Sequence, residues 1–376
     1  MPFERLERTQ PQLASRLRGE LEKGNLARSS LFFGPPYSSK MTAASELALA
    51  LLGEEDSFDT LASANLVIIP NRDSLIRLKA LRNILEKNRN LAAAGAFRHE
   101  NAVFLSAFHE ALYTNSQKDV FAAAAELSDV MYSFPSDPSS GQLEPFLKKY
   151  DEALARLISR KKKTSVYTID QVRQIQSFAF QNPDQRKVIV LEGTENVAAG
   201  TMNSILKILE EPPASVYFIL ISSSASRILP TILSRVRQYE FHEIEQKEEK
   251  QFLESTFFAH DSLSIQDFFF SAGGLDLAKL SSEAENFVHR LLIRRKPLDA
   301  QELTALSSFL EEFSAFDLFI RRVMEIIEDG FRQSVIADRP ASDILDLFCR
   351  AVTQADIYSQ NRRTMLERIQ RGISVL

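Results

Sequence analysis

The sequence predicts an α/β fold built on a parallel sheet of the phosphate-binding-loop type, followed by a helical C-terminal region. Three observations lead to this prediction. Strand and helix patterns alternate over residues 10–73 and again over residues 164–243. The strand segments are short, uninterrupted apolar runs, such as residues 188–191, which are typical of strands buried on both faces of a parallel sheet. Beyond about residue 245, only helical patterns are found.

Composition and charge limit the class of protein. The 376 residues are enough for two or three domains, and 44% hydrophobic with 25% charged residues is ordinary for a soluble globular protein. No apolar run approaches the roughly 18–20 residues that span a bilayer, and the charged N-terminal segment lacks the apolar core of a secretory signal. We therefore expect a cytoplasmic protein with no membrane partner. The net charge of −5 argues against a protein that coats nucleic acid, although it leaves room for a local basic surface.

Cysteine and histidine usage predicts no metal site. Cys349 is the single cysteine, which excludes an internal disulfide framework and any zinc site built from three or four cysteines. The five histidines show no ligand spacing with carboxylates. We therefore expect neither zinc nor another resident metal.

The first alternating stretch supplies two helices and two strands. Helices are expected over residues 10–23 and 40–52, and strands over residues 31–33 and 66–69. Gly53 follows the second helix, as glycine commonly does where a helix ends. A helical insertion then occupies about residues 74–163, with a loop at residues 135–141 and a renewed helical pattern over residues 146–158. The role of this insertion is open.

The second alternating stretch completes the sheet. Helices are expected over residues 169–180 and 198–211, and strands over residues 188–191, 216–221 and 239–242. Within the second of these helices, Met202, Ile205, Leu206 and Leu209 recur at the spacing of one buried face. The pair Pro212-Pro213 ends that helix.

A turn between a predicted strand and a predicted helix has the outline of a phosphate-binding loop. The intact motif, G-x-x-x-x-G-K-[ST], would run from Gly34 to the residue after Lys40. Ser39 replaces its second glycine, so we expect the backbone to lose access to positive φ and to close approach of phosphate. Met41 replaces its Mg²⁺-binding hydroxyl, and Thr42 points about 100° away. Lys40 could still meet a phosphate, or could be an ordinary solvated lysine.

The acidic half of such a site is incomplete. Hydrolysis of ATP at a site of this kind uses one carboxylate for Mg²⁺ and a neighbouring group to orient the attacking water. Here Glu192 is followed by Gly193, and Glu195 is expected at the surface of a loop. We therefore predict that the chain does not hydrolyse ATP. Weak nucleotide binding by Gly34, Lys40 and Glu192 is left open.

Ser234 and Arg235 follow a proline-marked turn, which would present the arginine at the edge of the domain. Two interpretations are open. The arginine could form an ordinary surface salt bridge. It could also be an arginine finger that reaches the nucleotide of an adjacent subunit, a role worth roughly 10³–10⁵ in rate where it operates.

Two motifs point to a known family. Residues 203–213 read NSILKILEEPP, similar to N-A-L-L-K-x-L-E-E-P-P, and residues 229–236 read LPTILSRV, similar to L-P-T-I-x-S-R-C with Val236 in place of the cysteine. Both patterns belong to the delta-prime family of bacterial DNA polymerase III, in the clamp-loader branch of the AAA+ proteins. Gly34 and Lys40 resemble its degenerate Walker A motif, and residues 361–367 are faintly similar to N-x-N-x-x-L-x-L-E. The resemblance covers residues 1–73 and 164–285 well and the C-terminal helices weakly.

The resemblance implies an AAA+ domain over residues 1–243, a helical lid over residues 244–285 and a collar for oligomerisation over residues 286–376. It also implies a non-catalytic subunit of the clamp loader, which opens the sliding clamp and loads it on primed DNA. Ser234 and Arg235 would face ATP on a neighbouring subunit. The implied partners are the gamma/tau motor and delta subunits, the clamp and, through the complex, primed DNA.

Three departures from the family pattern are visible. The zinc-binding cysteines are absent, Leu277 stands where the motor subunit carries a sensor arginine, and the insertion has no recognised counterpart. The lost motor residues favour the delta-prime branch. Two alternatives stay open: an active but divergent gamma/tau-like ATPase motor, and a repurposed AAA+ interaction scaffold that binds through the insertion. ATP turnover by the isolated chain would favour the first, and a different partner recovered through the insertion would favour the second.

Overall fold

The computed structural model describes residues 2–71, 74–113, 117–160, 168–197, 199–260, 263–332, 344, 347–348 and 362–375. These residues belong to two compact units, Met1–Gln266 and Asp267–Leu376. The boundary between the units falls inside the segment that was expected to form a lid. The division into three domains at residues 243 and 285 stays a prediction.

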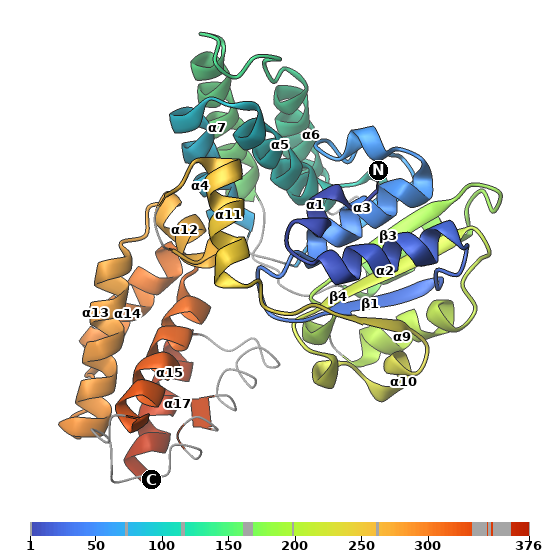
Figure 1. Cartoon of the computed structure of the whole chain (residues 1–376). Coiled ribbons are helices and arrows are strands. Elements are labelled where there is room, and N and C mark those ends of the chain that lie inside the picture. Colours follow the sequence, from blue (N-terminus) through green and yellow to red (C-terminus); the bar gives the residue numbers. More distant parts are fainter. Residues whose placement is uncertain are drawn as a thin grey trace. The chain divides into compact units, whose positions relative to one another are not determined.

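The first unit contains a five-stranded sheet in the order β2-β3-β4-β1-β5 (Figure 1). All four neighbouring pairs are parallel, which confirms the predicted α/β class. The strands are β1 (Ser29–Phe33), β2 (Leu66–Ile69), β3 (Lys187–Glu192), β4 (Val216–Ser222) and β5 (Arg237–Glu240).

Helices bury both faces of this sheet, and this explains the continuous apolar runs of its strands. Side chains alternate between faces along a strand. Phe32 and Val190 accordingly pack in one hydrophobic cluster with α2 (Pro11–Glu22) and α3 (Lys40–Leu52). Leu31 and Leu191 pack in a second cluster with α8 (Ile169–Phe180), α9 (Ala199–Glu210) and α10 (Pro230–Leu233). A strand between two such clusters has no polar face.

The element boundaries follow the sequence closely, with corrections at β1, α9 and β5. Strand β1 begins at Ser29, two residues before the predicted start at residue 31, because the buried Ser29 and Ser30 lie outside the apolar run. Helix α3 spans the predicted residues and ends at Gly53, whose φ is +73°. In α9, Met202, Ile205 and Leu209 are buried as expected, but Leu206 is only half-buried. Thr201 and Ile208, at 5% and 3% exposure, are the other buried positions of that face.

Strand β5 begins and ends two residues earlier than predicted, at Arg237 rather than residue 239 and at Glu240 rather than residue 242. The reason is its place at the edge of the sheet. Arg237, Gln238 and Glu240 are exposed and only Tyr239 is buried, so the strand has no apolar run that sequence patterns could detect.

In the residues that the structure describes, the insertion contains the helices α4 (Ser74–Asn88), α5 (Leu91–Ser106), α6 (Lys118–Tyr132) and α7 (Leu143–Arg160) and a short helical turn at Glu110–Leu112, as its helical pattern predicted. Helix α4 packs on α5, and α6 packs on α7. An aromatic group joins the two pairs, because the Phe97 ring of α5 contacts Phe134, Phe146 and Tyr150. The basic run at residues 161–163 lies outside the described residues.

The remaining described elements are helical. The first unit ends with α11 (Gln246–Phe257), and α12 (Ile265–Ala272) begins at the boundary. The second unit contains α13 (Leu277–Val288), a π-helical turn at His289–Ile293, α14 (Ala300–Glu312), α15 (Phe316–Arg332) and α17 (Arg362–Val375). Helix α13 packs on α15, and α14 packs on α17. Across the described parts of both units, every helix is too short or too polar to cross a lipid bilayer.

Candidate functional site

The loop at residues 34–40 connects β1 to α3, where the sequence placed a phosphate-binding turn. Gly34 has φ +148°, and a Cβ there would lie 2.1 Å from the carbonyl oxygen of Phe241. Glycine is therefore required at this position by the fold itself. Tyr37 and Ser39 also have positive φ, at +60° and +68°.

The expectation that Ser39 denies the loop a positive φ is wrong. A serine in the left-handed region costs about 1–2 kcal/mol, and neighbouring contacts offset such a cost. The hydroxyl of Ser39 accepts a hydrogen bond of 2.9 Å from Thr9 Oγ1. The N-terminal segment is fixed in turn by Glu46 of α3, whose carboxylate accepts the backbone N–H groups of Arg5 and Leu6 at 3.0 Å each. Burial of Glu46 raises the pKa of its carboxyl.

The ammonium group of Lys40 lies within its own loop. It donates to the carbonyl oxygens of Gly34, at 2.5 Å, and Pro35, and it lies 3.2 Å from the hydroxyl of Ser38. Of the two open interpretations, the ordinary solvated lysine does not fit, because this lysine ties its own loop together. A phosphate group would have to compete with these partners for the ammonium group.

The residue after Lys40 is a core residue. Met41 is only 5% exposed and packs in the hydrophobic cluster between α3 and the sheet. Thr42, the next residue, is half-buried. The position that carries a Mg²⁺-binding hydroxyl in the intact motif is occupied here by an apolar side chain inside the fold.

Asn71, which follows β2, lies against Glu192 and Gly193, where an intact site would carry its two acidic residues. Its backbone N–H donates to Glu192 Oε2 at 3.1 Å, and its amide group donates to the carbonyl oxygen of Gly193 at 3.4 Å. Gly193 has φ +71°, and a Cβ there would lie 2.2 Å from Asn71 Nδ2. A second carboxylate could not replace Gly193 without displacing Asn71.

Glu195 corrects a further expectation. It is half-buried rather than a surface residue, and its Oε1 accepts the backbone N–H of Ser223 at 2.8 Å. This bond joins the short helical turn after β3 to the end of β4. Glu195 therefore supports the carboxyl end of the sheet instead of lying free in a loop.

Arg235 follows α10 and contacts the end of α9. Its Nη2 lies 2.5 Å from Glu210 Oε1, while its Nη1 donates to the carbonyl oxygen of Thr231 at 2.5 Å and lies 3.1 Å from the hydroxyl of Ser234. The Arg235 side chain is 34% exposed and that of Glu210 is 44% exposed. Within this chain, the arginine forms the surface salt bridge that the sequence allowed.

The sheet register separates Arg235 from the loop. Glu192 pairs with Ile221, which pairs with Phe32, so Gly34, Lys40 and Glu192 all lie at the carboxyl end of the sheet. Arg235 precedes Arg237, which pairs with Ser30 near the start of β1. The structure thus places the three predicted nucleotide residues at the same end of the sheet, and Ser234 and Arg235 at the opposite end.

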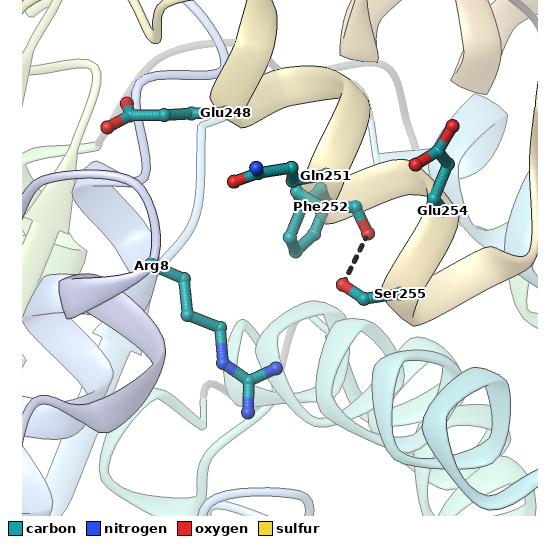
Figure 2. A pocket seen from close by; sticks show the side chains of 6 residues that line it. All are labelled: Arg8, Glu248, Gln251, Phe252, Glu254 and Ser255. Carbon is teal, nitrogen blue, oxygen red and sulfur yellow. Dashed lines mark hydrogen bonds between the residues drawn. The ribbon is translucent and has the colours of Figure 1, made fainter.

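Sequence reasoning missed Asn71, Thr9 and an open cavity of about 550 Å³ beside the N-terminal segment. Figure 2 shows the guanidinium group of Arg8 and the ring of Phe252 directed into this cavity. Its other lining residues are Glu248, Gln251, Glu254 and Ser255, all on α11. The sequence gives little signal of these features: Arg8 is seen only as the residue before Thr9, and Asn71 only as a residue that follows a strand. The reason is that their contacts join segments far apart in the chain.

Comparisons with known proteins support the family resemblance over one segment. Residues 146–245 match the family model described as DNA polymerase III, delta subunit. This segment includes β3, α9 and the turn at Arg235. The resemblance to delta-prime-like clamp-loader subunits is confirmed there.

Curated relatives match about a fifth of the chain. The DNA polymerase III subunit delta′ of Pseudomonas aeruginosa is 43% identical over 72 residues, which are 19% of this chain and 22% of the relative. The delta′ subunit of Haemophilus influenzae is 39% identical over 69 residues, 18% of this chain and 21% of the relative. The gamma/tau subunit of Mycobacterium tuberculosis is 35% identical over 75 residues, 19% of this chain and 13% of the relative. The matches thus span about a fifth or less of each relative.

A solved structure, of a DNA polymerase III gamma subunit-related protein from Thermotoga maritima, aligns with 97% of this chain and 99% of its own. The sequence identity is 14% and the TM-score is 0.41. A TM-score this low establishes neither a shared fold nor a shared function.

Proposed function

We propose that this chain is a non-catalytic, delta-prime-like subunit of a DNA polymerase III clamp loader. The observation that carries the proposal is the position of Arg235. The guanidinium group is partly exposed, and the length of the sheet separates it from the loop that contains Lys40. An arginine placed in this way cannot serve its own loop, but it is accessible to a nucleotide on a neighbouring subunit.

The proposed partners are the gamma/tau motor and delta subunits, the sliding clamp and, through the assembled complex, primed DNA. In this role Arg235 exchanges its exposed partner Glu210 for phosphate oxygens of the neighbour's ATP. The bidentate geometry of a guanidinium group suits both carboxylate and phosphate. Ser234 supports the arginine through its hydroxyl. The role requires no zinc and no metal of the chain's own.

The contacts of the loop favour loss of hydrolysis by the chain itself. Lys40 is bonded within the loop, Met41 is part of the core and Asn71 fills the space beside Gly193. Reaction at this site would need a rearrangement of all three positions. We therefore propose that any nucleotide binding at Gly34, Lys40 and Glu192 is weak.

The test is the ATPase rate of the matching motor and delta subunits, with clamp and primed DNA, in the presence of this chain. Native protein should stimulate turnover. Arg235→Ala should assemble but lower the rate by about 10³ at the site that the arginine faces. Arg237→Ala is a matched control, because Arg237 is also exposed and pairs with Glu20 at 3.0 Å. Equal stimulation by all three proteins would reject the role of Arg235.

A second candidate is an active, divergent gamma/tau-like motor. The observation in its favour is that Ser39 keeps the left-handed backbone that the loop of an intact motif requires. ATP turnover by the isolated chain that disappears in Lys40→Ala would establish this candidate. If the chain neither joins a loader complex nor hydrolyses ATP, the interaction-scaffold alternative becomes the leading one.

A further inference from the structure

Helix α5 anchors the insertion on the α/β part of the first unit. The His99 ring stacks on Phe58 with centroids 4.1 Å apart, and His99 Nδ1 lies 2.8 Å from the Phe58 carbonyl oxygen. Asp59 lies 3.7 Å from Arg98 of α5 and 3.8 Å from Arg5 of the N-terminal segment. A Cβ at Gly95 would approach Asp59 to 3.2 Å, so this face of α5 lies directly against the segment after the short helical turn Glu55–Ser57. The insertion is therefore attached along the length of a helix.

Helix α4 reaches the loop at residues 34–40. The Arg77 guanidinium carbon lies 5.1 Å from the centroid of the Tyr37 ring, within the range of a cation–π contact. Glu100 of α5 holds this arginine, with Nε and Oε2 3.1 Å apart. The Glu100 side chain is only 4% exposed, so the position of the guanidinium group is set by a carboxylate inside the insertion. The loop is thus contacted by the insertion as well as closed by Lys40.

The same two helices hold α11. The side-chain amide of Asn88, the last residue of α4, donates to the carbonyl oxygen of Phe257, the last residue of α11, at 2.5 Å. Carbonyl groups in the last turn of a helix have no partner within it, and this bond supplies one to Phe257. Helix α11 also packs on α5 (Figure 1). Leu253 and Phe257 of α11 are buried.

From these contacts we propose that the insertion, residues 74–160, is an internal brace that holds the loop at residues 34–40 and α11 in one arrangement on the sheet. Loop closure and helix displacement are the usual structural responses of a protein to a ligand, and each needs the moving element to be released. Here both elements are tied to α4 and α5. The braced chain keeps one conformation whether or not nucleotide is present.

This inference deepens the proposed non-catalytic role, yet its test needs only the isolated full-length chain and no partner subunit. Backbone hydrogen exchange is measured with and without millimolar ATP for native protein, Asn88→Ala and Arg77→Lys. Glu144→Gln is the matched control, because Glu144 pairs with Arg89, beside Asn88, entirely within the insertion. If Asn88→Ala fails to fold, Asn88→Asp removes the donor while keeping the side-chain shape.

We expect ATP to leave exchange of native α11 unchanged. Asn88→Ala should raise the exchange rates of the α11 amides about fivefold, through loss of one hydrogen bond. Arg77→Lys should raise those of the loop about two- to fivefold, because lysine lacks the flat guanidinium face. The Glu144→Gln control should change neither. Native-like exchange in both variants, or an ATP effect on native α11 as large as that of the variants, would overturn the brace. Neither result depends on whether Arg235 acts on a partner.

Discussion

The carboxyl end of the sheet and the turn at Arg235 each carry a basic side chain, but their surroundings differ. Lys40 is enclosed by carbonyl oxygens of its own loop, whereas Arg235 is partly exposed and pairs with Glu210, which is 44% exposed. A charged donor that is bonded to several oxygens of its own half-buried loop is difficult to exchange for a ligand, because those oxygens would be left without a donor. An exposed pair is exchanged easily, because water screens it. The first site therefore stabilises the loop of this chain, and the exposure of the second is what the proposed role of Arg235 depends on.

The largest effect on stability is expected at Gly193. A substitution there tests most directly whether the site around Lys40 differs in kind from the turn at Arg235. Gly193→Glu would restore an acidic pair with Glu192, but the new side chain would meet Asn71 and the backbone has φ +71°. We expect the free energy of unfolding to fall by about 2–4 kcal/mol. Adding Asn71→Ala should recover part of this loss, because it removes the 2.2 Å contact with Nδ2 and leaves the contact with the Cβ of residue 71 at 2.8 Å.

Urea denaturation of these variants is the measurement. Gly200→Ala is the control, because a Cβ at that helical position meets nothing within 4 Å, so this change should be neutral or slightly stabilising. If Gly193→Glu is as stable as native protein and hydrolyses ATP, the site lacks only one carboxylate and the contrast with Arg235 disappears.

The two basic residues can be compared directly by truncation. Lys40→Ala should lower the free energy of unfolding by about 1–3 kcal/mol, because loop carbonyl groups lose a charged donor. Arg235→Ala should cost less than about 1 kcal/mol, as is usual for an exposed ion pair. Denaturation midpoints of both variants measure the difference. If Arg235→Ala destabilises the chain more than Lys40→Ala does, then Arg235 stabilises this chain itself. The proposal that it is available to a neighbouring subunit would then lose its support.

The smallest expected effect concerns the support of the loop by Glu46, which is 7% exposed. Burial raises the pKa of this carboxyl above its usual 4.5, so the folded chain binds the proton more tightly than the unfolded chain does. The free energy of unfolding should therefore decrease as pH rises from about 4.5 through the folded pKa of Glu46. At pH values below about 4.5, the stabilisation that results from the raised pKa of Glu46 is fully present.

Denaturation at successive pH values measures this slope, and Glu46→Gln should remove it. Glu7→Gln is the control, since Glu7 is an exposed partner of Arg18. An unchanged slope in Glu46→Gln would show that other groups dominate the titration, and that the support of the N-terminal segment does not depend on this carboxyl.

The sequence alone determined the parallel sheet, β1 to β4, the ends of α3 and the helical nature of the insertion. These features depend on local properties. A strand covered on both faces is largely apolar, and a helix stops where Gly53 adopts positive φ. The two motifs that resemble clamp-loader subunits were also readable as contiguous residues, and the match over residues 146–245 confirms that part.

The tertiary structure decided what the individual side chains do. Asn71 lies 121 residues before its partner Glu192 in the sequence, and Thr9 lies 30 residues before Ser39, so no spacing rule connects them. The bounds of β5 depend on pairing with β1 rather than on an apolar run. The left-handed backbone of Ser39, the enclosure of Lys40 and the pairing of Arg235 with Glu210 arise in the same way. Each is fixed by contacts between segments that only folding brings together, whereas the pattern of a sequence reports which surfaces are buried and not which groups meet there.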